Sequence, residues 1–570
     1  MKRHKITWAL GLTLLLSLLL AACAQPATEA PAPTEMMEEP TEEPMAEPTE
    51  EMMAFEGMKV EAPDCDYGGI LKSIEAVDAY TVVFTTCVPD PGFPAKAAFS
   101  AFQIQSSDYL EATGGGGDLV AAPIGTGPYK LESWNRGESV VLSRFDDYWG
   151  EPAGSPTVVF RWSAEGTQKL IELQAGTVDG IDNVAPDDIA TVQADPALQL
   201  TPREAFNIFY VGMNNTYAPF DNEQVRQAIA MAIDRQRIVD NFYPAGSGSA
   251  DQFLPLGLLA RDNTAVGVAF DPVAAKALLA TAGFPNGFTT TLKYRNVFRG
   301  YLPEPVLVAQ DIASQLQENL GLTIEIVEME SGAFIDASNA GQLEGVYLLG
   351  WTGDYPDPTN FYDFHFGAGA TDQFGAKWDD ITSRLAEAGS LGDEEARRAL
   401  YTEVNGLLQQ HVPMVPVAHG ASACVYKATV QGAHCSPLGN ESMEAMFIEG
   451  QDTFTFMQNA EPIGLYCADE TDGESLRVCE QISESLLAYE VGGVIVIPSL
   501  AEAYSPNADA TVWTFTLRQG VKFHDGSDLD ANDVVASWAS WWDASNPLHV
   551  GRVGDFAYFS GLFGAYLNAP

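Results

Sequence analysis

The sequence predicts a mixed α/β fold that is divided into at least two lobes. Two observations lead to this prediction. About 510 residues follow a polar low-complexity segment near the amino terminus, and a chain of that length exceeds what a single hydrophobic core holds. Within those residues, β-rich stretches with alternating apolar positions are followed by stretches whose apolar residues recur every three or four positions. Strands and helices are therefore expected to alternate along the chain.

The strand and helix signals have definite positions. Asp221 is a suitable N-cap for the second predicted helix, and Gly176 is a suitable stop for the first. The predicted strands cover residues 81–86, 139–143, 157–162, 323–327 and 345–349, and the predicted helices cover 167–175, 221–240, 306–320, 377–388 and 393–410.

The amino terminus has the features of a secretion signal. Basic residues at positions 2, 3 and 5 precede an apolar run over 8–20, which is too short for a comfortable membrane span. The run ends in Leu-Ala-Ala before Cys23, the pattern of a lipoprotein cleavage site. Residues 1–23 are therefore expected to end at a lipidated Cys23, which would anchor the protein at the outer face of the cell membrane. The alternative is a plain signal peptide with an incidental cysteine.

Residues 24–56 consist almost only of Pro, Glu, Thr, Met and Ala in loose repeats. This composition offers too little apolar surface to offset chain entropy, and its like charges repel one another. We expect a disordered tether that holds the folded body away from the bilayer.

The charge balance excludes some classes of partner. Lys and Arg total 29 against 78 Asp and Glu, a formal net charge of −49. Nucleic acid and anionic lipid are poor partners for such a chain. The acidity mainly favours solubility, and a mild preference for cationic ligands is the second interpretation.

Of the seven cysteines, six follow Cys23, and an even number in an exported chain indicates disulfides. Six cysteines allow about fifteen pairings, and the simplest joins neighbours in sequence. A metal site is a weaker interpretation, because no Cys-x-x-Cys occurs and only His434 lies beside a cysteine. We expect no cofactor and no metal. The simplest pairs are Cys65 with Cys87, Cys424 with Cys435, and Cys467 with Cys479.

A set of short motifs is spread over the body of the chain. They are GTGPYK at 125–130, DYWG at 147–150, LQAG at 173–176, VRQAI at 225–229, AIDR at 232–235, GWTGDYPDP at 350–358, PSLAE at 498–502 and LRQGVKFHDG at 517–526. With this set the chain resembles the family 5 extracellular solute-binding proteins, the dipeptide and oligopeptide binders of ABC importers.

The order of the motifs departs from the pattern of that family. Residues 453–570 resemble the segment that normally comes first, whereas here they come last. The resemblance therefore implies a circular permutation, which is tolerated when the original termini lie close together. A misassembled or fused gene is the rival explanation.

The resemblance also implies the architecture. It is the two-lobed periplasmic-binding-protein-like fold, type II, in the large cluster with an extra subdomain, which closes on a ligand between its lobes. One lobe would combine residues 57–206 with 422–570, and the other would cover 212–419. The crossings between the lobes would lie near 205–212 and 413–422.

The motif at 350–358 matches the place where peptide binders of this family set an aspartate against the α-ammonium group of the ligand. This resemblance makes Asp354 the first candidate, with Trp351 and Tyr355 as apolar walls of side-chain pockets. Glu461 occupies the family's early loop facing the cleft. The alternatives are that Asp354 caps a turn before Pro356, that Trp351 belongs to the core and that Glu461 is an exposed loop carboxylate.

The resemblance implies a binding protein and not an enzyme. It would capture di- to oligopeptides outside the cytoplasmic membrane as a monomer and deliver them to the permease of an ABC transporter. An oligosaccharide, a metal chelate or another small solute is an alternative ligand, and sensing without transport is an alternative role. An exported hydrolase is the alternative of another class. His524 beside Asp525 suggests base chemistry, but the stretch resembles a tight turn, and no nucleophile elbow, phosphate loop or His-Glu-x-x-His occurs.

Overall fold

The computed structural model describes residues 55–163, 165–258, 261–296 and 299–569. Residues 55–570 form one compact unit. The signal segment, Cys23 and nearly all of the tether at 24–56 lie outside the described residues. Within the described ranges, no helix combines the length and apolarity needed to cross a bilayer.

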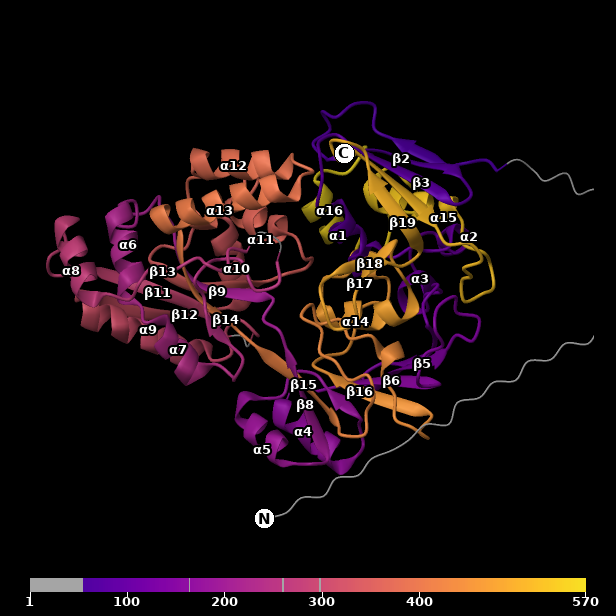
Figure 1. The fold of residues 1–570 in the computed structure, drawn as a ribbon, viewed down its shortest axis with the longest axis horizontal. Coiled ribbons are helices and arrows are strands. Elements are labelled where there is room, and N and C mark those ends of the chain that lie inside the picture. The colour runs from indigo at the N-terminus through magenta and orange to yellow at the C-terminus, as the bar shows by residue number, and fades with distance from the viewer. Residues whose placement is uncertain (1–54, 164, 259–260, 297–298, 570) are drawn as a thin grey trace, which may run out of the picture. The chain divides into compact units, whose positions relative to one another are not determined.

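Residues between 207 and 419 build a six-stranded sheet in the order β10-β14-β9-β13-β11-β12 (Figure 1). β9 is buried along its whole length and pairs antiparallel with β13 and β14, whereas β11 runs parallel to β12 and β13. Helices supply the connections between the parallel strands, as this pairing requires. The strands are β9 (Asn207–Met213), β10 (Gly248–Ser249), β11 (Thr289–Arg295), β12 (Thr323–Met329), β13 (Val346–Thr352) and β14 (Met414–His419).

Helices cover both faces of this sheet. Side chains alternate along β9, so Phe209 and Val211 belong to one apolar cluster while Ile208 and Tyr210 belong to another. The first cluster contains residues of α6 (Glu223–Ala232), α7 (Arg235–Phe242), α8 (Pro272–Thr281) and α9 (Pro305–Leu320). The second contains residues of α10 (Ser331–Asn339), α11 (Pro358–Phe366), α12 (Asp379–Gly389) and α13 (Glu394–His411).

The single helix predicted over 221–240 is wrong, because two helices, α6 and α7, occupy this range. The Asp234 side chain accepts a hydrogen bond from the Arg237 amide (3.0 Å), which starts α7, and its own amide donates to Gln315 (2.6 Å). The N-cap of α6 is Asn222 and not Asp221. Elsewhere the predicted elements are confirmed to within about three residues, and Gly176 ends α4 (Gly166–Ala175) in the left-handed conformation (φ 78°).

Two further sheets mix the beginning and the end of the body. β16 lies between β6 and β7 and runs parallel to both, and β20 lies between β3 and β19. In Figure 1, orange and yellow strands accordingly lie beside indigo and purple ones. The five-stranded sheet is β1 (Lys59–Glu61), β2 (Leu71–Asp78), β3 (Thr81–Thr86), β20 (Val512–Leu517) and β19 (Ala501–Pro506). The seven-stranded sheet is β4 (Tyr129–Asn135), β5 (Ser139–Arg144), β6 (Thr157–Trp162), β16 (Thr453–Gln458), β7 (Gly180–Ile181), β15 (Ser422–Lys427) and β8 (Leu198–Arg203).

The same mixing holds in the core beside the five-stranded sheet. α15 (Ala531–Trp542) buries Trp538, Trp541 and Trp542 completely, and the Trp538 ring lies 4.9 Å from that of Phe84. The last helix of the described chain also contacts the residue before β2: the Ile70 amide donates to the carbonyl of Phe563, at the end of α16 (Ala557–Phe563), at 2.8 Å. The remaining elements are α1 (Phe93–Ala97), α2 (Ser107–Thr113), α3 (Asp118–Ala121), α4 (Gly166–Ala175), α5 (Ile189–Ala194), α14 (Gly473–Ile482), α16 (Ala557–Phe563) and the hairpin of β17 (Leu487–Tyr489) and β18 (Val496–Pro498).

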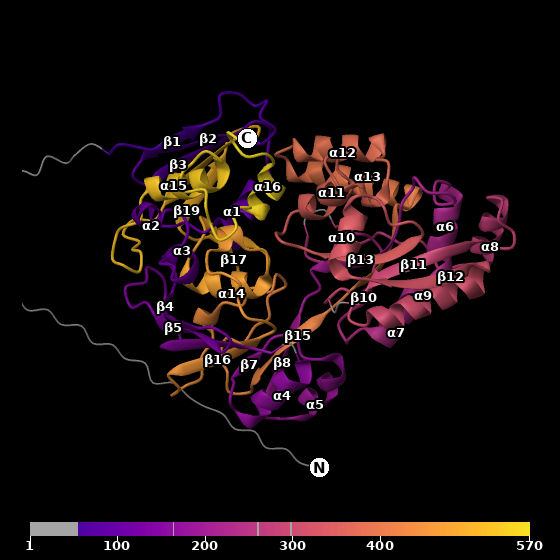
Figure 2. The ribbon, with the colours of Figure 1, turned by 180° about the vertical axis from the view of Figure 1, so that it is seen from behind.

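Two extended segments connect the six-stranded sheet to the seven-stranded one. β8 continues into β9, and β14 continues into β15 (Figure 2). Asn207 joins the two segments, because its side chain donates to the Gly420 carbonyl and accepts from the Gly420 amide, each at 2.8 Å. The two crossings therefore lie side by side.

Three disulfides stabilise the part of the chain that contains the two mixed sheets. They are Cys65–Cys87, Cys424–Cys435 and Cys467–Cys479, the three local pairs that the sequence predicts. A disulfide bridge reduces the number of conformations that the unfolded chain can adopt and so favours the folded state.

Candidate functional site

A short loop between β13 and α11 holds the first candidate residue. Gly353 begins the loop, and its amide donates to the Phe206 carbonyl (3.0 Å). A Cβ atom at this glycine would lie 2.1 Å from the Phe206 ring, so only glycine allows this close approach. Asp357 ends the loop as N-cap of α11 and pairs with Arg397 at 3.1 Å in a buried ion pair. Asp354 is therefore presented by a loop that is fixed at both ends.

Asn360, a buried residue of the first turn of α11, fixes the middle of this loop. Its Oδ1 accepts hydrogen bonds from the Asp354 amide (2.9 Å) and from Trp351 Nε1 (3.1 Å). Its Nδ2 donates to Asp354 Oδ2 (3.0 Å). The amide of Asn360 thereby orients the carboxylate of Asp354.

The other carboxylate oxygen of Asp354 reaches across to a distant part of the chain. Tyr558, in α16, donates a hydrogen bond to Asp354 Oδ1 at 3.3 Å. Burial raises the pKa of Asp354 to about 6, although the bonds from Asn360 and Tyr558 lower it. No salt bridge of the described residues includes Asp354. Its negative charge is therefore held in a partly desolvated place without a salt bridge to a described residue.

Asp354 lines a cavity of about 330 Å³. Both sides of the crossings contribute to its walls, so it lies between the six-stranded sheet region and the rest of the body. From the first come Arg299, Thr352, Gly353 and Asp354, and from the second come Phe99, Ser100, Leu438, Gly439, Asn440, Thr471, Gly473, Leu476, Arg477, Tyr489 and Tyr558.

Trp351 and Tyr355 do not line this cavity. Trp351 stacks on the Phe364 ring at 4.1 Å and packs against the core beside α11. Tyr355 is buried, and its hydroxyl group lies 3.0 Å from Thr359 Oγ1. Both side chains support the loop from behind, and their contact with a ligand stays a prediction.

Glu461 lies beside the turn between β4 and β5. Its carboxylate accepts hydrogen bonds from Trp134 Nε1 (3.2 Å) and from the Gly137 amide (3.1 Å), and Arg136 lies 3.8 Å away. It is absent from the lining of the cavity that contains Asp354. A role of Glu461 in ligand binding stays a prediction.

The His524 side chain is hydrogen-bonded to a segment that lies far from it in sequence, residues 125–127. Its Nδ1 accepts from the Gly125 amide (3.2 Å), and its Nε2 lies 3.0 Å from the Gly127 carbonyl oxygen. Burial lowers the pKa of His524 to about 4. Asp525 instead accepts from the Ser527 amide (3.0 Å) within its own turn. The two side chains therefore serve separate turns and do not form a histidine–carboxylate pair.

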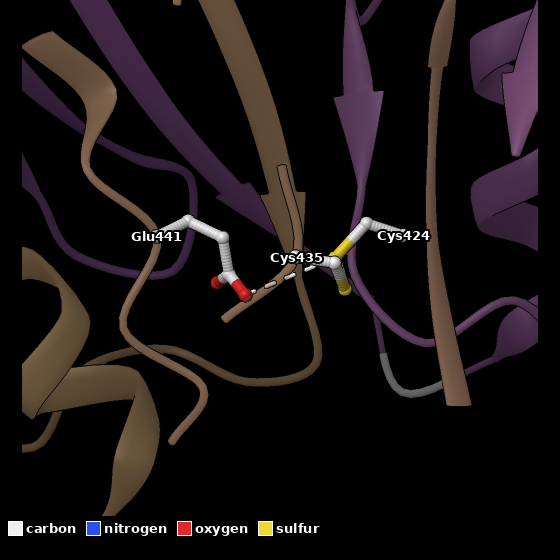
Figure 3. A group of neighbouring side chains, drawn as sticks. All are labelled: Cys424, Cys435 and Glu441. Carbon is white, nitrogen blue, oxygen red and sulfur yellow. Dashed lines mark hydrogen bonds between the residues drawn. A yellow bond between two sulfur atoms is a disulfide. The ribbon is translucent and has the colours of Figure 1, made fainter. Parts of the chain in front are cut away.

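One group of side chains consists of residue types that often bind metal ions, but these side chains are engaged with one another and with arginines. Cys424, Cys435 and Glu441 lie together, and the two sulfurs are joined in a disulfide (Figure 3). Glu441 is completely buried and pairs with Arg203 and Arg477, each at 2.6 Å. Its charge is thus already balanced, and the cluster belongs to the internal ion network of the protein.

Three residues that shape the site have no signal in the sequence. Tyr558 and Tyr489 come from segments more than a hundred positions from Asp354, and Asn440 comes from a loop without a motif. Asn360 alone had a local signal, because a polar residue in the first turn of a helix often bonds to the preceding loop.

Comparisons with known proteins agree with this architecture. The model of the bacterial extracellular solute-binding proteins, family 5 Middle, matches residues 39–373 and 496–553. The chain belongs to this family. Heme-binding protein A of Haemophilus influenzae is 30% identical over 390 residues, which are 67% of this chain and 71% of that protein. Di/tripeptide-binding protein 1 of Pseudomonas aeruginosa is 30% identical over 376 residues, 65% of this chain and 70% of that protein.

Solved structures show the same two-lobed fold. HbpA2 from Haemophilus parasuis has a TM-score of 0.61 at 30% identity, covering 67% of this chain and 76% of that one. The periplasmic binding protein DppA from Helicobacter pylori, in complex with the peptide STSA, has a TM-score of 0.55 at 26% identity, covering 67% and 74%. The predicted family and the predicted α/β fold class are thus confirmed.

Proposed function

We propose that this solute-binding protein captures short peptides, from dipeptides to oligopeptides, and delivers them to the permease of an ABC importer. The carboxylate of Asp354 receives the α-ammonium group of the peptide. The observation that carries this proposal is a partly desolvated carboxylate in a cavity between the two regions, with no salt bridge to a described residue although Arg299 and Arg477 line the same cavity. Relatives that are named for dipeptides and tripeptides support the ligand class.

The physical reason lies in the cost of burying a charge. A carboxylate that leaves water without a counter-ion is unfavourable, and burial accordingly raises its pKa. An ammonium group supplies both the opposite charge and hydrogen-bond donors. Peptides of any sequence carry this group, so one fixed carboxylate accepts a broad set of them. Hydrolysis has no part in the proposal.

The test is thermal unfolding of the purified protein with di- to pentapeptides, with oligosaccharides, heme and nickel as comparison ligands. We expect a saturable rise of the unfolding midpoint with peptides, because ligand binding to the folded state stabilises it. Asp354→Asn should remove most of this rise. Stabilisation by sugars, heme or nickel alone would overturn the peptide assignment.

We also propose that the protein is lipid-anchored through Cys23 and works as a monomer on the outer side of the cytoplasmic membrane. The sequence pattern before Cys23 and the acidic segment after it support this. Expression with labelled palmitate checks it: the wild type should carry the label in the membrane fraction, and Cys23→Ser should lose it. A labelled Cys23→Ser chain would contradict the anchor.

Finally, we propose that one lobe comprises residues 57–206 and 422–570, that the other comprises 212–419, and that the chain is circularly permuted. The strands of 453–570 complete sheets that begin in 57–203, and linear alignments with relatives extend over about two thirds of the chain. A gene in which 453–569 precedes 57–452 tests the permutation. Its product should keep the unfolding midpoint and the peptide affinity, and an unfolded product would count against it.

A further inference from the structure

A second cavity of about 230 Å³ adjoins the one that contains Asp354. Ser100, Asn440 and Tyr489 line both cavities, so the two are adjacent. We call this second cavity the acidic chamber. Its other lining residues are Ala98, Gln103, Pro128, Tyr148, Trp149, Ser442, Glu444, Glu480, Gln481, Ser483, Glu484, Ser485, Leu487, Ala488, Glu490, Val491, Ile497, Pro498 and Ser499.

We propose that the acidic chamber holds a cationic side chain of the bound peptide, so that peptides containing lysine or arginine are the preferred ligands. This inference rests on the proposed function and narrows its ligand class. Glu480 is the residue that determines the preference.

The charges of the lining are all of one sign. Four carboxylates face the chamber, and no lysine, arginine or histidine occurs among its described lining residues. The four are Glu444, Glu480, Glu484 and Glu490, and no salt bridge of the described part of the chain includes any of them. A partly enclosed space with several carboxylates that form no salt bridge favours a cation and disfavours an anion.

Glu480 stands at the junction of the two cavities. It belongs to α14, and the two residues that bind it, Asn440 (Nδ2 to Oε1, 3.0 Å) and Ser100, line both spaces. Burial, together with the neighbouring Glu441, raises the pKa of Glu480 to about 7, although its bonds from Asn440 and Ser100 lower it. Arg477 lowers it, but that guanidinium group is already paired with Asp182 (2.9 Å) and Glu441 (2.6 Å). A ligand cation would therefore supply the charge that Glu480 lacks.

Tyr489 lines both the cavity that contains Asp354 and the chamber that contains Glu480. Burial, and then the charges of Glu480 and Asp354, raise the pKa of Tyr489, whose hydroxyl group donates to the Ala95 carbonyl (2.8 Å). Because Ser100 and Asn440 also line both spaces, a peptide whose ammonium group binds Asp354 would have its first side chains directed toward the acidic chamber.

The far wall of the chamber is aromatic. Glu484 accepts hydrogen bonds from Tyr148 (2.9 Å), Trp149 (2.9 Å) and Thr126 (2.8 Å), and so fixes both rings. Arg518 lies over the Trp149 ring, 4.5 Å from its centroid, and donates to the Ser499 carbonyl. Aromatic rings beside carboxylates fit the methylene stem and charged head of a lysine or arginine side chain.

Calorimetric titration of the full-length protein tests the inference with four peptides. They are Lys-Ala-Ala and Ala-Lys-Ala, each compared with its analogue in which norleucine replaces lysine. Norleucine keeps the stem and lacks the charge. In the better pair, we expect the wild type to bind the lysine peptide at least about tenfold more tightly, a difference that one charge pair supplies.

The variants assign this preference to the chamber. Glu480→Gln should reduce the lysine preference to within about threefold while leaving the affinity for the norleucine peptide unchanged. Glu502→Gln, the same change at an exposed residue outside the chamber, should keep the full preference, and unfolding midpoints without ligand should confirm that both variants are folded. Asp354→Asn should weaken both peptides of a pair equally.

Each other outcome has a defined meaning. Equal wild-type affinities for the lysine and norleucine peptides would overturn the chamber inference and leave the proposed function intact. Cadaverine binding as tightly as the lysine peptide, with no effect of Asp354→Asn, would make a free amine the ligand and overturn the inference for peptides. No binding of any peptide by the folded protein would overturn both.

Discussion

The carboxylate of Asp354 gives the proposed function its sharpest test, because its ionisation should control peptide affinity. The pKa of about 6 means that about 90% of the group is ionised at pH 7 and about 10% at pH 5. An ammonium group binds the ionised form, so affinity is present above pH 6 and is lost as the pH falls below it. The Kd of trialanine should therefore rise about tenfold from pH 7 to pH 5.

Asp354→Asn keeps the shape of the side chain and removes the charge. We expect its Kd for trialanine at pH 7 to be roughly 30-fold higher, a loss of about 2 kcal/mol of binding free energy, and to be constant between pH 5 and pH 7. Tyr558→Phe removes a hydrogen bond that lowers the pKa of Asp354, so the midpoint of the pH profile should move upward. Calorimetric titration at intervals of half a pH unit measures all three profiles. A wild-type Kd that does not change with pH, or an Asn variant that keeps the wild-type slope, would refute the reasoning.

Three further predictions concern stability. Arg477→Met should lower the free energy of unfolding by about 3–5 kcal/mol, because it leaves Asp182 and Glu441 buried with one cation fewer; an unchanged thermal midpoint would contradict this. Reduction of the three disulfides, whose cysteines are 22, 11 and 12 positions apart, should lower the free energy of unfolding by about 3 kcal/mol for each bridge. Denaturant unfolding curves with and without reductant should therefore differ widely, and coincident curves after verified reduction would disprove the prediction. Gly353→Ala should lower the free energy of unfolding by about 1–3 kcal/mol and weaken trialanine binding, since the new Cβ meets the Phe206 ring. Gly392→Ala, where a new Cβ would have no atom within 4 Å, is the control. Equal effects of both variants would show that crowding at the loop is unimportant.

The sequence predicted local features well. Thr81–Thr86 and Thr157–Trp162 are strands with the predicted bounds, and the end of α4 at Gly176 was also anticipated. Apolar periodicity and glycine stops act over a few residues, which is why the sequence alone reveals them. The break at Asp234 was missed because the Asp234 amide donates its hydrogen bond to Gln315, far along the chain.

The candidate site was predicted only in part. The loop with Asp354 was found through its motif, but Trp351 and Tyr355, next to it in sequence, turn toward the interior and support the loop from behind. Alternation along an extended segment does not tell which face meets a cavity, because the partner surface comes from elsewhere. Tyr558 has no signal of its own, since only the contact between α16 and the loop makes it a partner of Asp354.

The sequence by itself determined the family, the α/β class, the main strands and helices, and the local cysteine pairs, because each depends on residues that are close along the chain. Only the tertiary structure decided that β16 and β20 insert into sheets whose first strands, β4 and β1, come from the beginning of the body, and that Tyr489 lines the cavities of both Glu480 and Asp354. Those contacts join segments that lie tens to hundreds of positions apart. Their geometry is set by the packing of whole sheets and helices, which no local pattern of residues encodes.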